Sequence, residues 1–145
     1  MSTVIRNNHD TIYIDRKKLE ELKILAQKDP NKRARICLHK DDGEMVQEMI
    51  IAFCKDSYIR PHRHTDKSES YHIIEGRIEI IFYNDNGIEI DKVVLSDKID
   101  EHPFLFRISN SAWHTVVPKS DFVIIHEVTK GPFNKNSSEF ADWES

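Results

Sequence analysis

The chain has 145 residues, 39% hydrophobic and 32% charged, a composition typical of a globular domain rather than a disordered or fibrous chain. Its 21 basic and 25 acidic residues give a formal net charge of −4. The sequence shows no basic stripe interleaved with aromatic residues, so we expect no nucleic-acid partner. It also shows no signal-peptide run, no apolar stretch of the roughly 20 residues that would cross a membrane, and no disulfide-like cysteine spacing. We therefore expect a soluble, cytoplasmic protein with no membrane partner.

The first predicted element is an N-terminal α-helix over residues 15–28. Apolar side chains recur along one face at helical spacing, at Leu19, Leu22, Leu25 and Ala26. Asp15 is suited to cap the first turn because its side chain can accept a hydrogen bond from a backbone N–H there. Pro30 ends the helix because a proline disfavours helical geometry in the residue before it.

From about residue 33 to residue 130 the sequence becomes a series of short runs rich in β-branched and aromatic residues. Turn signals such as "KDDGE", "NDNG" and "PKSD" separate them. Asn86-Gly87 is typical of a tight hairpin, since both residues tolerate positive φ. Short strands joined in this way favour an antiparallel sandwich or barrel. We predict one mainly β domain over residues 1–145, with a polar C-terminal tail at 131–145 whose Phe140 and Trp143 dock on it.

The stretch "PHRHTDKSESYHIIEG" predicts a metal site. Side chains alternate between the faces of a strand, so His62 and His64 point the same way with Cβ atoms about 6.6–6.8 Å apart. On a helix the same spacing would make them diverge. Glu69 follows the turn "TDKS" and opens a second strand; if that strand pairs antiparallel with the first, Glu69 returns to the level of His64. Gly76 then permits a tight reversal into the next strand.

A further ligand is expected from another strand, and His114 follows a polar turn in "FRISNSAWHTVVP". Three neutral imidazoles and one carboxylate suit a divalent transition metal such as Fe, Mn, Ni, Zn or Cu better than Mg or Ca. Octahedral coordination would leave two positions for water or substrate. The alternative is that these are polar residues on a surface hairpin, because an isolated His-x-His pair is more often a surface feature than a ligand pair.

The spacing His62-x-His64-x4-Glu69-x6-Gly76 resembles the first motif of the cupins, and "ISNSAWH", which ends in His114, is similar to the second. The segments "RARICLHKDD", "VQEMIIAF", "SYIRPHRHTDKSES" and "HEVTKGPF" further resemble the WbuC family of cupin-fold metalloproteins. This resemblance covers about residues 12–143. The sequence departs from the cupin pattern at three positions where glycine or proline is usual, which are Asp56, Ser109 and Ser111.

The resemblance implies a cupin-type antiparallel β-barrel (jelly roll) whose metal is held by His62, His64, Glu69 and His114. It also implies a role on a sugar-related small molecule, because genes of the WbuC family lie among those for polysaccharide (O-antigen type) biosynthesis. Six residues are candidates for substrate binding. Tyr58 and Arg60 lie on the same face of the predicted strand as His62 and His64. Lys67 lies in the turn between the predicted ligands His64 and Glu69. Arg35, His39 and Glu127 lie in segments where the resemblance is strong.

Three functions remain open from the sequence. The first is an enzyme in which the metal acts as a Lewis acid in the isomerisation or epimerisation of a sugar. The second is an Fe(II)-dependent dioxygenase. The third is a non-catalytic module that binds a sugar with the help of the metal. The sequence identifies no catalytic residue. Exposed sheet edges in a cupin-like barrel favour a homodimer, with a small molecule as the other partner.

Overall fold

The computed structural model describes residues 2–109 and 111–143. Within them the chain forms one α-helix, one short 3-10 helix and eleven strands, in the order β1 (Thr3–Ile5), α1 (Arg16–Lys28), β2 (Arg33–Cys37), β3 (Val46–Cys54), β4 (His62–His64), β5 (Glu69–Glu75), β6 (Arg77–Tyr83), β7 (Glu89–Ser96), β8 (Leu105–Ile108), β9 (Trp113–Pro118), β10 (Phe122–Lys130), η1 (Lys135–Ser137) and β11 (Ser138–Phe140).

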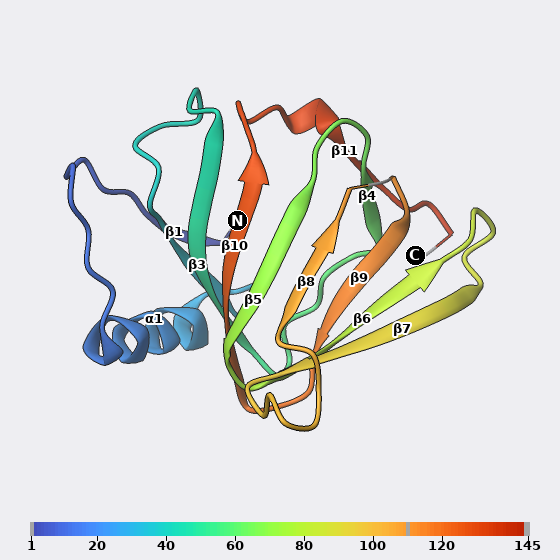
Figure 1. Ribbon diagram of the computed structural model, residues 1–145, viewed down its shortest axis with the longest axis horizontal. Helices are drawn as coiled ribbons and strands as arrows, with labels where there is room; N and C mark the ends of the chain where they lie inside the picture. Colours follow the sequence, from blue (N-terminus) through green and yellow to red (C-terminus); the bar gives the residue numbers. More distant parts are fainter. Residues whose placement is uncertain (1, 110, 144–145) are drawn as a thin grey trace.

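The strands form two sheets that face each other around a common core (Figure 1). The six-stranded sheet has the order β1-β2-β3-β10-β5-β8, and the five-stranded sheet has the order β11-β4-β9-β6-β7. Strands pair antiparallel throughout the described residues, except for β1 with β2. The prediction of a mainly β, antiparallel jelly roll with an N-terminal helix is confirmed.

Helix α1 lies against the outer face of the six-stranded sheet, beside β2 and β3 (Figure 1). As predicted, the side chain of Asp15 caps it and accepts a hydrogen bond from the backbone N–H of Lys18 at 3.0 Å. Leu22 and Ala26 are fully buried in a cluster with residues of the sheet. No helix of the described residues has both the length and the apolar character needed to cross a membrane.

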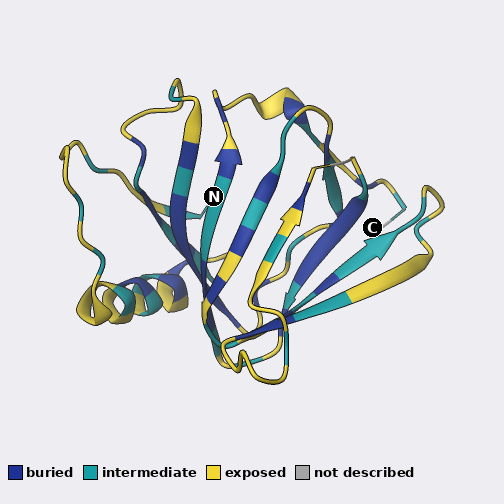
Figure 2. Cartoon of the chain, viewed as in Figure 1, coloured by how far each residue is buried: buried dark blue, intermediate teal, exposed yellow. Residues whose placement is uncertain are grey.

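The main core lies between the two sheets, where buried positions alternate with exposed ones along several strands (Figure 2). On β10, Val123 and Ile125 belong to this core. Strand periodicity therefore turns Glu127 toward the same interior, because it lies two residues beyond Ile125. His126 faces outward, where its Nε2 lies 2.6 Å from a carboxylate oxygen of Glu48. The apolar sequence around His126 and Glu127 did not predict which of the two side chains faces inward.

The predicted hairpin at Asn86-Gly87 joins β6 to β7, and Gly87 has a φ of 81°. The sequence did not predict β1 or β11, which have three residues each. β11 pairs with β4, so part of the predicted tail is an edge strand of the five-stranded sheet. Beyond it the ring of Trp143 lies 5.0 Å from that of Trp113, measured between centroids.

Candidate metal centre

Three histidines meet on the inner face of the five-stranded sheet. His62 and His64 lie two apart on β4, and His114 lies directly opposite His62 on the neighbouring strand β9. The ring centroid of His62 is 5.0 Å from that of His64 and 4.6 Å from that of His114. One ligand nitrogen from each ring lies within 4.8 Å of the other two. The three side chains could therefore hold one metal ion.

Backbone carbonyls fix the orientation of two of these rings. Nδ1 of His62 lies 2.8 Å from the carbonyl oxygen of Arg60, and Nδ1 of His114 lies 3.0 Å from that of Ala112. A carbonyl oxygen only accepts hydrogen bonds, so each Nδ1 carries the proton and donates it. In a neutral imidazole this leaves the lone pair on Nε2. This tautomer can bind a metal through Nε2.

A serine from the C-terminal segment holds the third ring. Nδ1 of His64 lies 2.9 Å from Oγ of Ser138, which is the register partner of His64 in the β11–β4 pairing. Sequence reasoning missed Ser138, because three strand residues within a polar tail give too short a pattern to recognise. The contact orients the ring as carbonyls and carboxylates orient metal-binding histidines elsewhere.

Glu69 approaches the histidines from the opposite sheet. The sequence suggested that its strand pairs with the strand of His64, but β5 pairs with β10 and β8 instead. Glu69 is buried at the start of β5, with Oε1 3.0 Å from Nε2 of His64 and Oε2 3.8 Å from Nε2 of His114. The hydroxyl of Tyr71 donates a hydrogen bond to Oε2 at 2.8 Å. The carboxylate thus reaches the histidines across the barrel interior.

The Nε2 atoms of His64 and His114 are buried and make no hydrogen bond within residues 2–109 and 111–143. The oxygens of Glu69 lie near both, but without hydrogen-bond geometry. A buried polar atom without a partner is costly. A cation among them would satisfy all three groups. Three nitrogens and one oxygen are a donor set that fits a divalent transition metal.

The charge states of His62 and Glu69 are those that metal ligands require. Burial, together with the nearby His114, lowers the pKa of His62 to about 4, so this ring is neutral at neutral pH. Burial alone would raise the pKa of Glu69, but His114 and His64 outweigh it and hold the pKa of this carboxyl far below its usual range. Neutral imidazole and ionised carboxylate bind metals without first losing a proton.

Three of the predicted substrate-binding residues are linked electrostatically in the barrel. Burial, and then the negative charge of Glu69, raises the pKa of Glu127 to about 8, while Lys67 and Arg35 act in the opposite direction. Glu127 is therefore largely protonated at neutral pH. It is an inward-facing carboxyl that can give up or take back a proton near pH 7.

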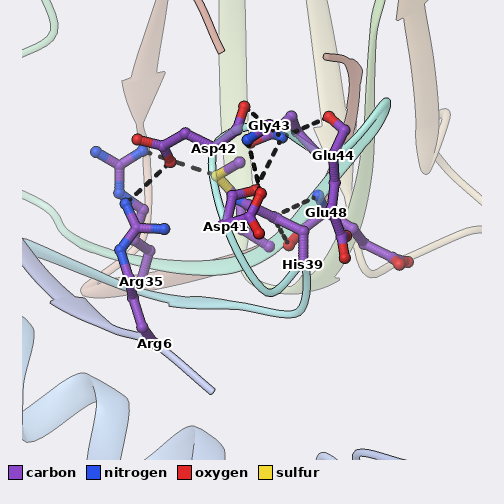
Figure 3. A network of polar contacts seen from close by, with 10 residues as sticks. Arg6, Arg35, His39, Asp41, Asp42, Gly43, Glu44 and Glu48 are labelled. Carbon is purple, nitrogen blue, oxygen red and sulfur yellow. Dashed lines mark hydrogen bonds and ion pairs between the residues drawn. The ribbon is translucent and has the colours of Figure 1, made fainter. Parts of the chain in front are cut away.

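The structure places Arg35 and His39 in a polar network around the loop that joins β2 to β3 (Figure 3). Arg35 donates a long hydrogen bond of 3.8 Å to the sulfur of Met49. His39 is buried, and its Nδ1 lies 3.0 Å from both the backbone nitrogen and the carbonyl oxygen of Glu48. These contacts give His39 a role in holding the strand ends.

The other two candidates, Tyr58 and Arg60, lie in the segment before β4. Tyr58 is 63% exposed. The guanidinium of Arg60 donates to the carbonyl of Ala141 and lies 5.7 Å from the ring centroid of Phe140. Arg60 therefore contacts the C-terminal segment.

A pocket of about 400 Å³ opens beside the histidines. The β4–β5 connection, the region between β8 and β9 and the end of β10 surround it, and these segments meet at one end of the barrel (Figure 1). Its described lining is polar or charged throughout and consists of His64, Thr65, Asp66, Lys67, Ser68, Ser109, Ser111 and Lys130. His64 belongs to both the pocket and the histidine cluster, so a molecule in the pocket would lie next to the metal centre.

Comparison with solved structures defines the fold. SO0799 from Shewanella oneidensis matches with a TM-score of 0.60 and 11% identity, over 73% of this chain and 72% of that one. A cupin superfamily protein from Desulfitobacterium hafniense matches with a TM-score of 0.52 and 16% identity, over 69% and 78%. The capsular polysaccharide assembling protein CapF from Staphylococcus aureus matches with a TM-score of 0.57 and 17% identity, over 70% of this chain but only 29% of CapF. The fold is that of a cupin.

The sequence places the protein within a narrower group. Residues 14–95, more than half of the chain, match the model of the family described as "Domain of unknown function (DUF6016)", and the chain belongs to this family. A search of curated proteins found no match.

Proposed function

We propose that this protein is a metal-dependent cupin of the WbuC type that binds and transforms a sugar-related small molecule in polysaccharide biosynthesis. In this proposal His62, His64, Glu69 and His114 hold a divalent transition metal. The observation that carries it is the pair of buried Nε2 atoms that face Glu69 beside a polar pocket. When bound, the metal would supply Lewis acidity that polarises a carbonyl or hydroxyl of the ligand.

The chain's own groups supply the other requirements of an isomerisation or epimerisation. Such a reaction needs a group that removes a proton from carbon and returns it. Glu127 faces the interior, and in the metal-free protein burial raises its pKa to about 8, a range that suits proton transfer near neutral pH. The hydroxyl-rich pocket can replace the water around a sugar, and the hydroxyl of the buried Tyr71 holds the Glu69 carboxylate in place through a hydrogen bond.

Two observations support a sugar-related ligand. The cupin motifs lie in segments that resemble the WbuC family, whose genes accompany those for polysaccharide biosynthesis. A part of CapF that makes up 29% of its chain shares this fold, and CapF by its name assembles capsular polysaccharide, which supports a ligand of that kind here. A cytoplasmic location and a homodimer, both expected from the sequence, belong to the same proposal.

The first test is the metal content of untagged protein. We expect about one metal per chain in the wild type, almost none in His62→Ala/His64→Ala, and wild-type content in His9→Ala/His102→Ala, whose histidines lie outside the cluster. Wild-type protein that takes up no metal even after reconstitution would contradict the proposal.

The second test is turnover. The metal-loaded protein is incubated with a panel of nucleotide sugars and sugar phosphates and the products are followed by NMR, with Glu127→Gln as the variant that removes the proposed proton carrier. We expect turnover by the wild type and at least a hundredfold loss in Glu127→Gln. Metal-dependent binding without turnover would favour a non-catalytic module, and oxygen uptake by iron-loaded protein would favour a dioxygenase.

A further inference from the structure

Two lysines from distant parts of the sequence line the pocket beside the metal centre. Lys67 lies in the β4–β5 connection and Lys130 ends β10. Among the residues that the structure describes, neither ammonium group forms a side-chain hydrogen bond or an ion pair with a carboxylate. Two like charges that face one pocket without partners raise the potential inside it and favour an anion there.

The rest of the lining indicates what kind of anion fits. Thr65, Ser68, Ser109 and Ser111 contribute hydroxyl-bearing side chains. Pockets for apolar ligands are lined mainly by hydrophobic and aromatic residues, and the described part of this lining contains none. Asp66 is its single carboxylate, so the two lysines leave a net positive charge. A ligand that carries both hydroxyls and a negative group matches this surface.

The pocket also adjoins the metal centre. The charge of Lys67 is felt by Glu127, which faces the core side of β10. His64 lines the pocket and belongs to the histidine cluster. A ligand held at the lysines would therefore extend toward the metal centre.

We propose that this pocket binds the carboxylate or phosphate group of a polyhydroxylated small molecule, with Lys67 and Lys130 as its counter-charges. The serine hydroxyls hydrogen-bond to the same anion or to neighbouring hydroxyls of the ligand. The inference rests on the proposed function and narrows its substrate class to anionic sugars, such as sugar acids or sugar phosphates. Neutral sugars would lack the group that the lysines hold.

The test is isothermal titration of the metal-loaded protein with three matched probes, gluconate, glucose 6-phosphate and glucose, at one fixed ionic strength. We expect at least one anionic probe to bind tenfold or more tightly than glucose, and the stronger of the two identifies the anion class. Lys67→Ala/Lys130→Ala should weaken anion binding at least tenfold. Lys55→Ala/Lys98→Ala should leave it unchanged, since the segments that follow β3 and β7 lie at the opposite end of the barrel (Figure 1).

Three results would overturn the inference: equal binding of glucose and the anions, undiminished anion binding by Lys67→Ala/Lys130→Ala, or no binding of any probe. Metal content measured on the same samples separates this failure from failure of the proposed function. If the protein holds metal but its anion binding does not depend on Lys67 and Lys130, the inference alone is refuted. Protein that binds the anion through the lysines but holds no metal refutes the proposed function alone. Circular dichroism on each variant shows that it is folded.

Discussion

Oγ of Ser138 lies 2.9 Å from Nδ1 of His64, and this contact joins the C-terminal segment to the metal centre. Backbone hydrogen bonds before and after Ser138 hold the segment against β4 and the residues next to it. The backbone N–H of Thr65 donates to the carbonyl of Ser137 at 3.0 Å, and that of Ala141 donates to the carbonyl of Pro61 at 2.9 Å. The C-terminal segment thus lies directly beside the strand that carries two of the three histidines.

We expect Ser138→Ala to weaken metal binding tenfold to a hundredfold, because it removes the hydrogen-bond partner that orients the ring of His64. Competition with a chromogenic chelator measures the affinity. Ser138→Thr is the control, since threonine keeps the hydroxyl and is well suited to a strand. Equal affinities for the wild type and Ser138→Ala would show that the ring is held without this contact.

The lowered pKa of His62 predicts loss of stability in acid. The pKa is about 4 in the folded protein and 6.5 ordinarily, so between these values the unfolded chain binds the proton first. The free energy of unfolding of metal-free protein should therefore fall as the pH drops from 6.5 to 4, by at most about 3 kcal/mol from this group. Urea denaturation in the presence of EDTA measures it. His62→Gln should flatten the profile, whereas His9→Gln, at an exposed position, should not. A parallel decline in His62→Gln would assign the loss to other groups.

Glu127 predicts the opposite pH dependence. Its pKa is about 8 in the folded protein and 4.5 ordinarily, so the folded state holds the proton more tightly between these values. Stability is favoured below pH 4.5 and is lost as the pH rises to 8. In metal-free protein Glu127→Gln stays neutral and should be more stable than the wild type at pH 9, by up to about 5 kcal/mol. The difference should disappear near pH 4. A variant less stable than the wild type at pH 9 would mean that the ionised carboxylate has a stabilising partner.

Local patterns predicted the parts of this structure that depend on neighbouring residues. The helix followed from the spacing of residues such as Leu22 and its cap at Asp15, and the hairpin followed from Asn86-Gly87. The closeness of His62 and His64 followed from strand parity alone. Each of these features is decided within about ten residues of sequence, where periodicity and turn chemistry are informative.

The features that the sequence missed depend on which distant strands meet. Glu69 was expected beside His64 through a hairpin, but the chain crosses to the other sheet between them. Ser138 reaches His64 through a pairing of strands that lie 74 residues apart at this point. Lys130 shares a pocket with Lys67 only because β10 ends beside the end of the β4–β5 connection, where the backbone N–H of Lys130 donates to the carbonyl of Ser68. No local pattern encodes such pairings, since they are decided by the packing of the whole barrel.

Gly76, the glycine of the first cupin-like motif, lies at a position where the backbone leaves no room for a side chain. Gly76 joins β5 to β6 with a φ of 91°, and a Cβ there would clash with the carbonyl oxygen of Phe122 and lie 2.5 Å from Oγ of Ser120. Both the positive φ and the contact with backbone oppose any side chain. Gly76→Ala should lower the free energy of unfolding in urea by about 3 kcal/mol or more. Gly43→Ala is the matched control, because its Cβ would meet only the side-chain oxygen of Asp41, at 3.1 Å, and it should cost about 1 kcal/mol or less. Similar losses in the two variants would show that the turn after β5 can relax, and that the glycine of the motif is not required by the backbone of this barrel.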